Sequence, residues 1–226
     1  MPCGLRFEKL LWSKGVSLVA GIDEAGRGPL AGPVVAAVAV LPTKFSLAGL
    51  NDSKQLAEEF REELFEALTA SGALVCYGVG IAEPAEVDRF NILRATFLAM
   101  QRAIAALPIQ PEHLLIDGLP VPVFQQPQTA IVGGDGKSKS IAAASVIAKV
   151  HRDGMMRELD SIHPQYGLAS HKGYATPEHR EALRILGPTI LHRKSFAPVG
   201  QCELPWEELD EIAPEDTPAC PIDSSL

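Results

Sequence analysis

The chain has 226 residues, a formal net charge of −8 and four cysteines. This length is typical of one domain, or at most two small ones, and 46% hydrophobic residues suffice for a full core. The cysteines form no Cys-x-x-Cys pair, and no apolar run reaches the roughly 20 residues that span a membrane. We therefore expect a cytoplasmic protein with reduced thiols and no membrane segment, and we predict a monomer.

Charge is distributed unevenly along the chain. Residues 136–200 contain ten Lys and Arg against five Asp and Glu, whereas residues 201–226 contain eight acids and no Lys or Arg. The last segment is also rich in proline, and we predict that it is a disordered acidic tail after a domain of residues 1–200. The overall negative charge therefore does not exclude a polyanionic substrate.

Apolar runs and capping residues predict alternating strands and helices from the N-terminus onward. The first strand is predicted at 16–21, and the second, at 33–41, consists almost wholly of Val and Ala, as in a strand buried on both faces. Asp52 or Ser53 is the expected cap of a helix over 58–70. The elements expected after it are a strand at 73–81, a helix at 84–107, strands at 114–116 and 129–132, a helix at 141–159 opened by Ser138 or Ser140, a loop at 161–175 and a helix at 177–186.

Acidic residues follow three of the predicted strands. Asp23 and Glu24 come after the first strand, Asp117 after the strand at 114–116, and Asp135 lies in a glycine-rich turn after the strand at 129–132. Each Asp-Gly pair alone is more often a simple turn. Because sites in open α/β sheets gather outside strand ends, the four acids together predict a site for two divalent metal ions, Mg²⁺ or Mn²⁺.

Two nucleotide-binding motifs fail on their spacing. Gly26, Gly28 and Gly32 do not have the intervals of a dinucleotide fingerprint, and the neighbouring acids would repel a pyrophosphate. The segment 136–138 (Gly-Lys-Ser) resembles the end of a P-loop, but that motif needs glycine where this chain has Ile131. Neither motif supports a nucleotide-binding protein.

The segment 21–34, Gly-Ile-Asp-Glu-Ala-Gly-Arg-Gly-Pro-Leu-Ala-Gly-Pro-Val, resembles the signature of the type 2 ribonucleases H, specifically ribonuclease HII. Further similar segments lie at 52–56, 116–118, 134–135, 140–153, 171–176 and 192–196. The resemblance covers residues 16–199 and implies an α/β ribonuclease H-like fold with a mixed central sheet and C-terminal helices. The sister family, ribonuclease HIII, fits less well because Arg27 matches the HII pattern and we expect no additional N-terminal domain.

The resemblance implies an endonuclease that cuts the RNA strand of RNA–DNA hybrids and cuts 5′ of single ribonucleotides embedded in duplex DNA. It implies that Asp23, Glu24, Asp117 and Asp135 are the catalytic, metal-binding carboxylates. Gly26, Arg27 and Gly28 would recognise the ribose 2′-hydroxyl through backbone groups. Tyr174 would stack on the sugar of the following deoxynucleotide.

Several basic residues are candidates for phosphate contacts, although each could be a solvated surface charge: Lys54, Lys137, Lys139 and Lys172. Arg152 and Asp153 are expected to form a structural or helix-surface pair. Two other functions stay open, a non-catalytic hybrid-binding protein and a metal-dependent nuclease for DNA strands. The four carboxylates disfavour the first, and the glycine loop with Tyr174 disfavours the second.

Overall fold

A five-stranded mixed sheet forms the centre of the computed structural model, which describes residues 3–70 and 75–201. The strands are β1 (Val19–Ala25), β2 (Val34–Val40), β3 (Cys76–Ala82), β4 (His113–Asp117) and β5 (Gln128–Ile131). Their spatial order is β3-β2-β1-β4-β5, with antiparallel pairing of β3, β2 and β1 and parallel pairing of β1, β4 and β5. The predicted mixed sheet is therefore confirmed, with shifted strand ends. Residues 73 and 74 of the third predicted strand lie outside the described residues.

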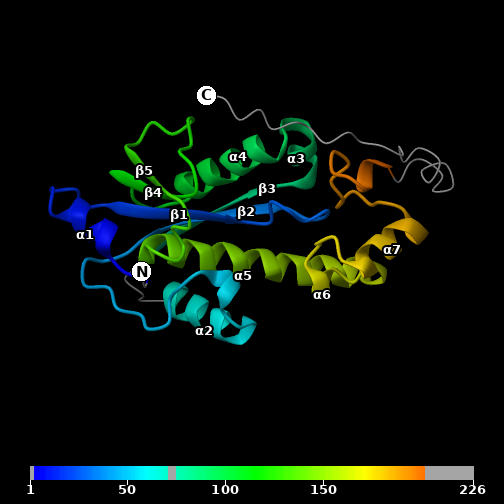
Figure 1. Cartoon of the computed structure of the whole chain (residues 1–226), viewed down its shortest axis with the longest axis horizontal. Helices are drawn as coiled ribbons and strands as arrows, with labels where there is room; N and C mark the ends of the chain where they lie inside the picture. The colour runs from blue at the N-terminus through cyan, green and yellow to red at the C-terminus, as the bar shows by residue number, and fades with distance from the viewer. Residues whose placement is uncertain (1–2, 71–74, 202–226) are drawn as a thin grey trace, which may run out of the picture.

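Helices cover both faces of this sheet (Figure 1). They are α1 (Arg6–Trp12), α2 (Glu58–Thr69), α3 (Pro84–Phe90), α4 (Ile92–Ala105), α5 (Lys139–Ile162), α6 (Leu168–His171) and α7 (Pro177–Leu186). Helices α3 and α4 lie on one face, and α5 with α2 lies on the other, so the fold has three layers. Within the described residues, no helix is long and apolar enough to span a membrane.

Strand β2 explains why the middle of the sheet is built from Val and Ala. All seven of its residues are buried, and they alternate between the two cores: Val34, Ala36 and Val38 pack towards α4, whereas Ala37 and Ala39 pack towards α5. The two-sided burial predicted from the sequence is thus confirmed. Small side chains suit this position because helices lie close to the sheet on both sides.

The prediction of one helix over 84–107 is wrong, because the helix is interrupted at Asn91. This residue has a φ of 67° and ends α3, and its side chain caps α4 by accepting hydrogen bonds from the amides of Leu93 and Arg94. The expected loop over 161–175 is also partly wrong, since α5 continues to Ile162 and a 3₁₀ turn and α6 follow it. Asp52 caps the 3₁₀ turn Ser53–Gln55 rather than α2, and α1 was not predicted.

The C-terminal helices form a small separate core at one end of the sheet (Figure 1). In this core Leu30 and Ala31, from the loop between β1 and β2, pack with Met156 of α5 and Leu183 of α7. The Leu30 amide also donates to the Gly173 carbonyl at 2.8 Å. The C-terminal extension therefore brings the segment around Tyr174 against the glycine-rich loop. The predicted acidic tail comprises residues 201–226, of which only Gln201, at the end of a 3₁₀ turn, is described.

Candidate active site

Three aspartates converge near the C-terminal ends of the neighbouring strands β1 and β4, a place that we call the acidic edge of the sheet. These strands are parallel, and the pairing of Ile22 with Ile116 places Asp23 beside Asp117. Asp135 joins them from the turn that precedes α5. One carboxylate oxygen from each aspartate lies within 4.8 Å of those of the other two. The convergence expected from the sequence is therefore observed for these three residues.

Glu24 lies outside this triad because successive residues of a strand face opposite sides of the sheet. The sequence placed Asp23 and Glu24 after the first strand, but β1 continues to Ala25 and both are inside it. The Glu24 carboxylate instead pairs with Arg27, whose Nη1 lies 3.1 Å from its Oε1. Glu24 therefore borders the aspartates with its charge partly compensated.

The triad is electrostatically unfavourable as it stands. Asp23 is 3% exposed and Asp135 7% exposed. Burial, together with the charges of Glu24 and Asp117, raises the pKa of Asp23 well above its usual range, and burial and Asp117 also raise the pKa of Asp135. None of the ion pairs among the described residues involves these three aspartates.

The donor set of the triad fits a hard divalent cation. Asp23 Oδ1 accepts a hydrogen bond from the Glu24 amide at 2.7 Å, whereas its Oδ2 is buried without a partner in the described structure. An oxygen-only set of this kind suits Mg²⁺ or Mn²⁺ better than a metal that prefers nitrogen or sulfur ligands. A bound cation would supply the partner that Asp23 Oδ2 lacks.

Lys54 faces the acids from the 3₁₀ turn after β2. Burial lowers the pKa of Lys54, but the charges of four aspartates, led by Asp23 and Asp135, together outweigh burial, and the pKa is raised. The Asp52 carboxylate accepts a hydrogen bond from the Lys54 amide and fixes the turn that carries it. Lys54 is thus held as a cation next to the acidic cluster.

A hollow of about 510 Å³ joins the acidic edge to the glycine-rich loop and Tyr174. Glu24, Gly26, Arg27, Gly28, Lys54 and Tyr174 are among its lining residues. Tyr174 is 43% exposed, and a Cβ added to Gly28 would lie 3.9 Å from its ring. The structure therefore brings the glycine-rich loop, Lys54 and Tyr174 together, whereas the other candidate lysines, Lys137, Lys139 and Lys172, do not line this hollow.

Two buried arginines that the sequence analysis gave no role in the site shape the glycine-rich loop. The Arg193 guanidinium donates to the carbonyls of Gly26, Arg27, Pro29 and Gly32 at 2.6–3.1 Å. Burial, followed by the charge of Arg152, lowers the pKa of Arg193 to about 9. Because the loop carbonyls turn inwards, the amides of Arg27 and Gly28 have no acceptor within the described residues.

Arg152 holds the same loop from α5. It does not form the structural or helix-surface pair with Asp153 that we expected. Its guanidinium donates to the carbonyls of Ala31, Pro33 and Lys172. Asp153 pairs with Lys149 at 2.7 Å and with Arg61 at 3.7 Å. The expected pair was wrong because both side chains are buried and find different partners.

The other candidate lysines contact protein groups. Lys172 donates to the Ala169 carbonyl and lies 3.7 Å from Glu58. Lys137 donates to the Val132 carbonyl, and Lys139 donates to the Leu47 carbonyl at 3.1 Å. Their predicted phosphate contacts stay predictions.

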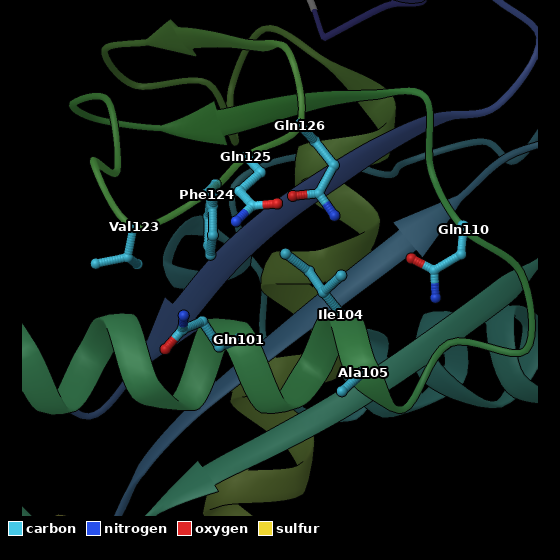
Figure 2. A pocket seen from close by; sticks show the side chains of 8 residues that line it. All are labelled: Gln101, Ile104, Ala105, Gln110, Val123, Phe124, Gln125 and Gln126. Atoms are coloured by element: carbon cyan, nitrogen blue, oxygen red, sulfur yellow. The ribbon is translucent and has the colours of Figure 1, made fainter.

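Three further hollows lie along α4. One, of about 630 Å³, is lined mainly by apolar side chains such as Phe90 and Phe97 and has no carboxylate in its lining. Of the remaining two, only one has acidic lining residues. One, of about 350 Å³, is lined by Glu24, Arg27 and Asp117 together with apolar residues of α4 and of the loop after β4, so it adjoins the acidic edge. The other, of about 370 Å³, lies between the end of α4 and the segment around Phe124 (Figure 2). Its lining residues are uncharged and comprise Gln101, Ile104, Ala105, Gln110, Val123, Phe124, Gln125 and Gln126. The hollow around Phe124 therefore has no carboxylate, imidazole or thiol in its lining and offers no acid–base group.

A mixed sheet whose neighbouring parallel strands present an oxygen-only acidic cluster, beside a cleft with a glycine loop and a lysine, defines a metal-dependent nuclease. Comparison with known proteins places it more closely. The family model described as "Ribonuclease HII" matches residues 20–199. The chain belongs to the ribonuclease HII family and is a metal-dependent endoribonuclease.

Individual relatives agree with this placement. A "Ribonuclease HII" from Desulfitobacterium hafniense (strain Y51) is 57% identical over 197 residues, which cover 87% of this chain and 75% of the relative. One from Geobacillus kaustophilus is 54% identical over 205 residues, covering 91% and 78%. The crystal structure of the ribonuclease H2 from Pyrococcus horikoshii OT3 superposes with a TM-score of 0.68 at 29% identity, covering 82% of this chain and 97% of that one. The predicted ribonuclease H-like fold is thereby confirmed.

Proposed function

We propose that this endoribonuclease, whose family cleaves the RNA strand of RNA–DNA hybrids, also cuts duplex DNA on the 5′ side of a single embedded ribonucleotide. The observation that carries the proposal is the single hollow in which Glu24, the Gly26–Gly28 loop and Tyr174 meet. Acids that hold a metal and a loop that recognises a ribose are then adjacent. Cleavage would leave 3′-hydroxyl and 5′-phosphate ends.

Four carboxylates would hold the metal: Asp23, Glu24, Asp117 and Asp135. Two divalent ions, Mg²⁺ or Mn²⁺, would supply an activated water and stabilise negative charge on the scissile phosphate. Only Oε1 of Glu24 contacts Arg27, so Oε2 is available to a metal, and the Arg27 guanidinium would have substrate phosphate as a further partner. Lys54, held as a cation beside the acids, is positioned to contact phosphate as well.

Recognition of the ribonucleotide would come from the backbone of the glycine-rich loop. The Arg27 and Gly28 amides are unpaired within the described structure, and Arg193 and Arg152 fix the loop from behind. A 2′-hydroxyl can accept from such an amide, and DNA has no such group. Tyr174, which is exposed beside Gly28 in the same hollow, would stack on the sugar of the next deoxynucleotide, and Lys172 would contact phosphate near it.

The test uses two duplexes that differ in one 2′-hydroxyl. Incubation with Mg²⁺ or Mn²⁺ should cut the duplex with a single ribonucleotide, on its 5′ side, and leave the all-DNA duplex intact. Tyr174→Ala should slow this cut at least tenfold while cleavage of a long hybrid falls less. Ile162→Ala, at a position 67% exposed on α5, is the matched control and should leave both rates unchanged.

The same assay separates the alternatives. Equal cutting of both duplexes would favour a nuclease for DNA strands, and binding without cutting at any metal concentration would favour a hybrid-binding protein. If the proposal holds, removal of ribonucleotides would place the enzyme in DNA replication and repair. A cytoplasmic location and a monomeric state stay predictions.

A further inference from the structure

Helix α1 precedes the residues that the family model matches, and it carries a fully buried carboxylate. The match begins at residue 20, whereas α1 spans Arg6–Trp12 and its Glu8 is 0% exposed. A buried carboxylate on a short terminal helix is unfavourable unless it is hydrogen-bonded. The contacts of Glu8 show what compensates it.

Glu8 binds the N-terminus of α5 through one oxygen. Its Oε1 accepts from Ser138 Oγ at 2.6 Å, from Ser140 Oγ at 2.7 Å and from the Ser140 amide at 3.0 Å. The first turn of this 24-residue helix has no acid of its own. Glu8 therefore supplies the negative charge that a helix N-terminus favours, and it does so from another element.

The segment that Glu8 holds is the one that carries the metal ligand Asp135. The turn over 134–138 is closed by hydrogen bonds from the amides of Lys137 and Ser138 to the Gly134 carbonyl, at 2.9 and 2.7 Å. The Gly134 amide donates to Asp117 Oδ1 at 2.6 Å. One end of this turn thus orients Asp117, its middle carries Asp135, and its other end, Ser138, is bonded to Glu8.

The N-terminal segment makes three further contacts with residues 135–139. The Gly4 amide donates to the Lys137 carbonyl at 3.3 Å, and the Gly4 carbonyl accepts from the Lys139 amide at 3.0 Å. Cys3 Sγ lies 3.8 Å from the Asp135 carbonyl as a weak donor. Residues 3–8 are therefore hydrogen-bonded to residues 135–140 from Asp135 to Ser140.

We propose that Glu8 is a positioning residue of the metal site: its carboxylate holds the turn over 134–138 so that Asp117 and Asp135 present their oxygens to the metal. This inference rests on the proposed metal ligands. Residues that orient metal ligands by hydrogen bonds commonly change metal affinity by 10- to 100-fold when they are replaced. We expect a comparable loss of metal affinity when Glu8 is replaced, although Glu8 lies on α1 and acts on the turn that precedes α5.

The experiment measures Mn²⁺ binding to the full chain by titration calorimetry without substrate. Glu8→Gln keeps the size of the side chain but removes its charge, and Ser140→Ala removes one donor while the charge stays. Both variants should weaken Mn²⁺ binding by about tenfold or more. Val87→Ala, on α3 in the core that α3 and α4 form with the sheet, is the control for general loss of stability and should bind Mn²⁺ as the unmodified chain does.

Each outcome bears on the proposal. Unchanged Mn²⁺ binding in Glu8→Gln and Ser140→Ala would overturn it, as would equal weakening in Val87→Ala. Weaker Mn²⁺ binding in Glu8→Gln but not in Ser140→Ala would also overturn it, because the loss of a nearby negative charge would then explain the effect. If Glu8→Gln does not fold, the comparison of Ser140→Ala with Val87→Ala decides. Asp135→Asn identifies the other failure, because unchanged Mn²⁺ binding in that variant would remove the proposed metal site itself.

Discussion

Replacing Asp23 by Asn removes one negative charge from the acidic triad and keeps the size of the side chain. The triad oxygens lie within 4.8 Å of one another, and two full charges at this separation repel by about 3 kcal/mol at an effective dielectric constant of about 20. Burial raises the pKa of Asp23 and of Asp135, so partial protonation reduces this repulsion, and Lys54 offsets more of it. We expect Asp23→Asn to raise the free energy of unfolding of the metal-free protein by about 1–2 kcal/mol.

Thermal unfolding with EDTA and with Mn²⁺ measures this effect. In EDTA the Tm of Asp23→Asn should exceed that of the unmodified chain by about 2–8 °C. Mn²⁺ at about 100 times its dissociation constant should stabilise the unmodified chain by about 2.7 kcal/mol, and it should stabilise the variant much less. Cleavage of the hybrid should be abolished in the variant, while hybrid binding persists.

A metal-free variant less stable than the unmodified chain would contradict this prediction, because the negative charge of Asp23 would then not be repelled by the other acids. An equal rise in the Tm of both proteins with Mn²⁺ would contradict it as well. Full cleavage by Asp23→Asn with metal present would remove Asp23 from the catalytic site. Ser161→Ala, on the exposed end of α5, serves as the control for the unfolding measurements.

Three further predictions concern the support of the site. Arg193→Met leaves four loop carbonyls without their donor and should lower the free energy of unfolding by about 3 kcal/mol or more in urea titrations, with a raised KM for substrate. Gly21→Ala should prevent stable folding, seen by circular dichroism, because its Cβ would lie 2.1 Å from the Ser140 carbonyl carbon. Protons compete with metal at Asp23 and Asp135, whose pKa values are raised, so Mn²⁺ affinity should rise with pH and binding should release protons, detected by calorimetry in buffers of different ionisation enthalpy. The folding stability of the metal-free protein should change with pH in the opposite direction. The stability that the raised pKa values of Asp23 and Asp135 contribute is present at low pH and is lost as pH rises through those values.

Local pattern sufficed for the parts of the fold and site whose determinants are local. The Val and Ala run of β2 and the acids near strand ends are visible in the sequence, and the parallel pairing of β1 with β4 then brings Asp23 and Asp117 together. The pairing of Glu24 with Arg27 was not predicted, because it depends on where β1 ends. The prediction placed Asp23 and Glu24 beyond the end of the strand, where side chains need not alternate. Inside β1 they face opposite sides of the sheet.

Other features depend on contacts that no local pattern reveals. Arg193 bonds carbonyls more than 160 positions away in the sequence, and carbonyls are present at every residue. Asn91 interrupts a helical pattern with a positive φ, which is uncommon for a residue other than glycine. Helix α1 has seven residues, too few to be stable alone, and its own Glu8 ties it to the N-terminus of α5 through Ser138 and Ser140.

The distribution of positive charge around the site explains why the acids stay available to a metal. Arg193 and Arg152 are buried near the acidic edge, yet every hydrogen bond of their guanidinium groups goes to a backbone carbonyl. Had either bonded an aspartate, the triad would be neutralised by protein and a divalent ion would have to displace a buried salt bridge. Instead the arginines use their donors to shape the loop, and among the described residues the triad has no ion-pair partner. Because the arginines bond carbonyls and not aspartates, the loop is held in its conformation and the acids still require a cation.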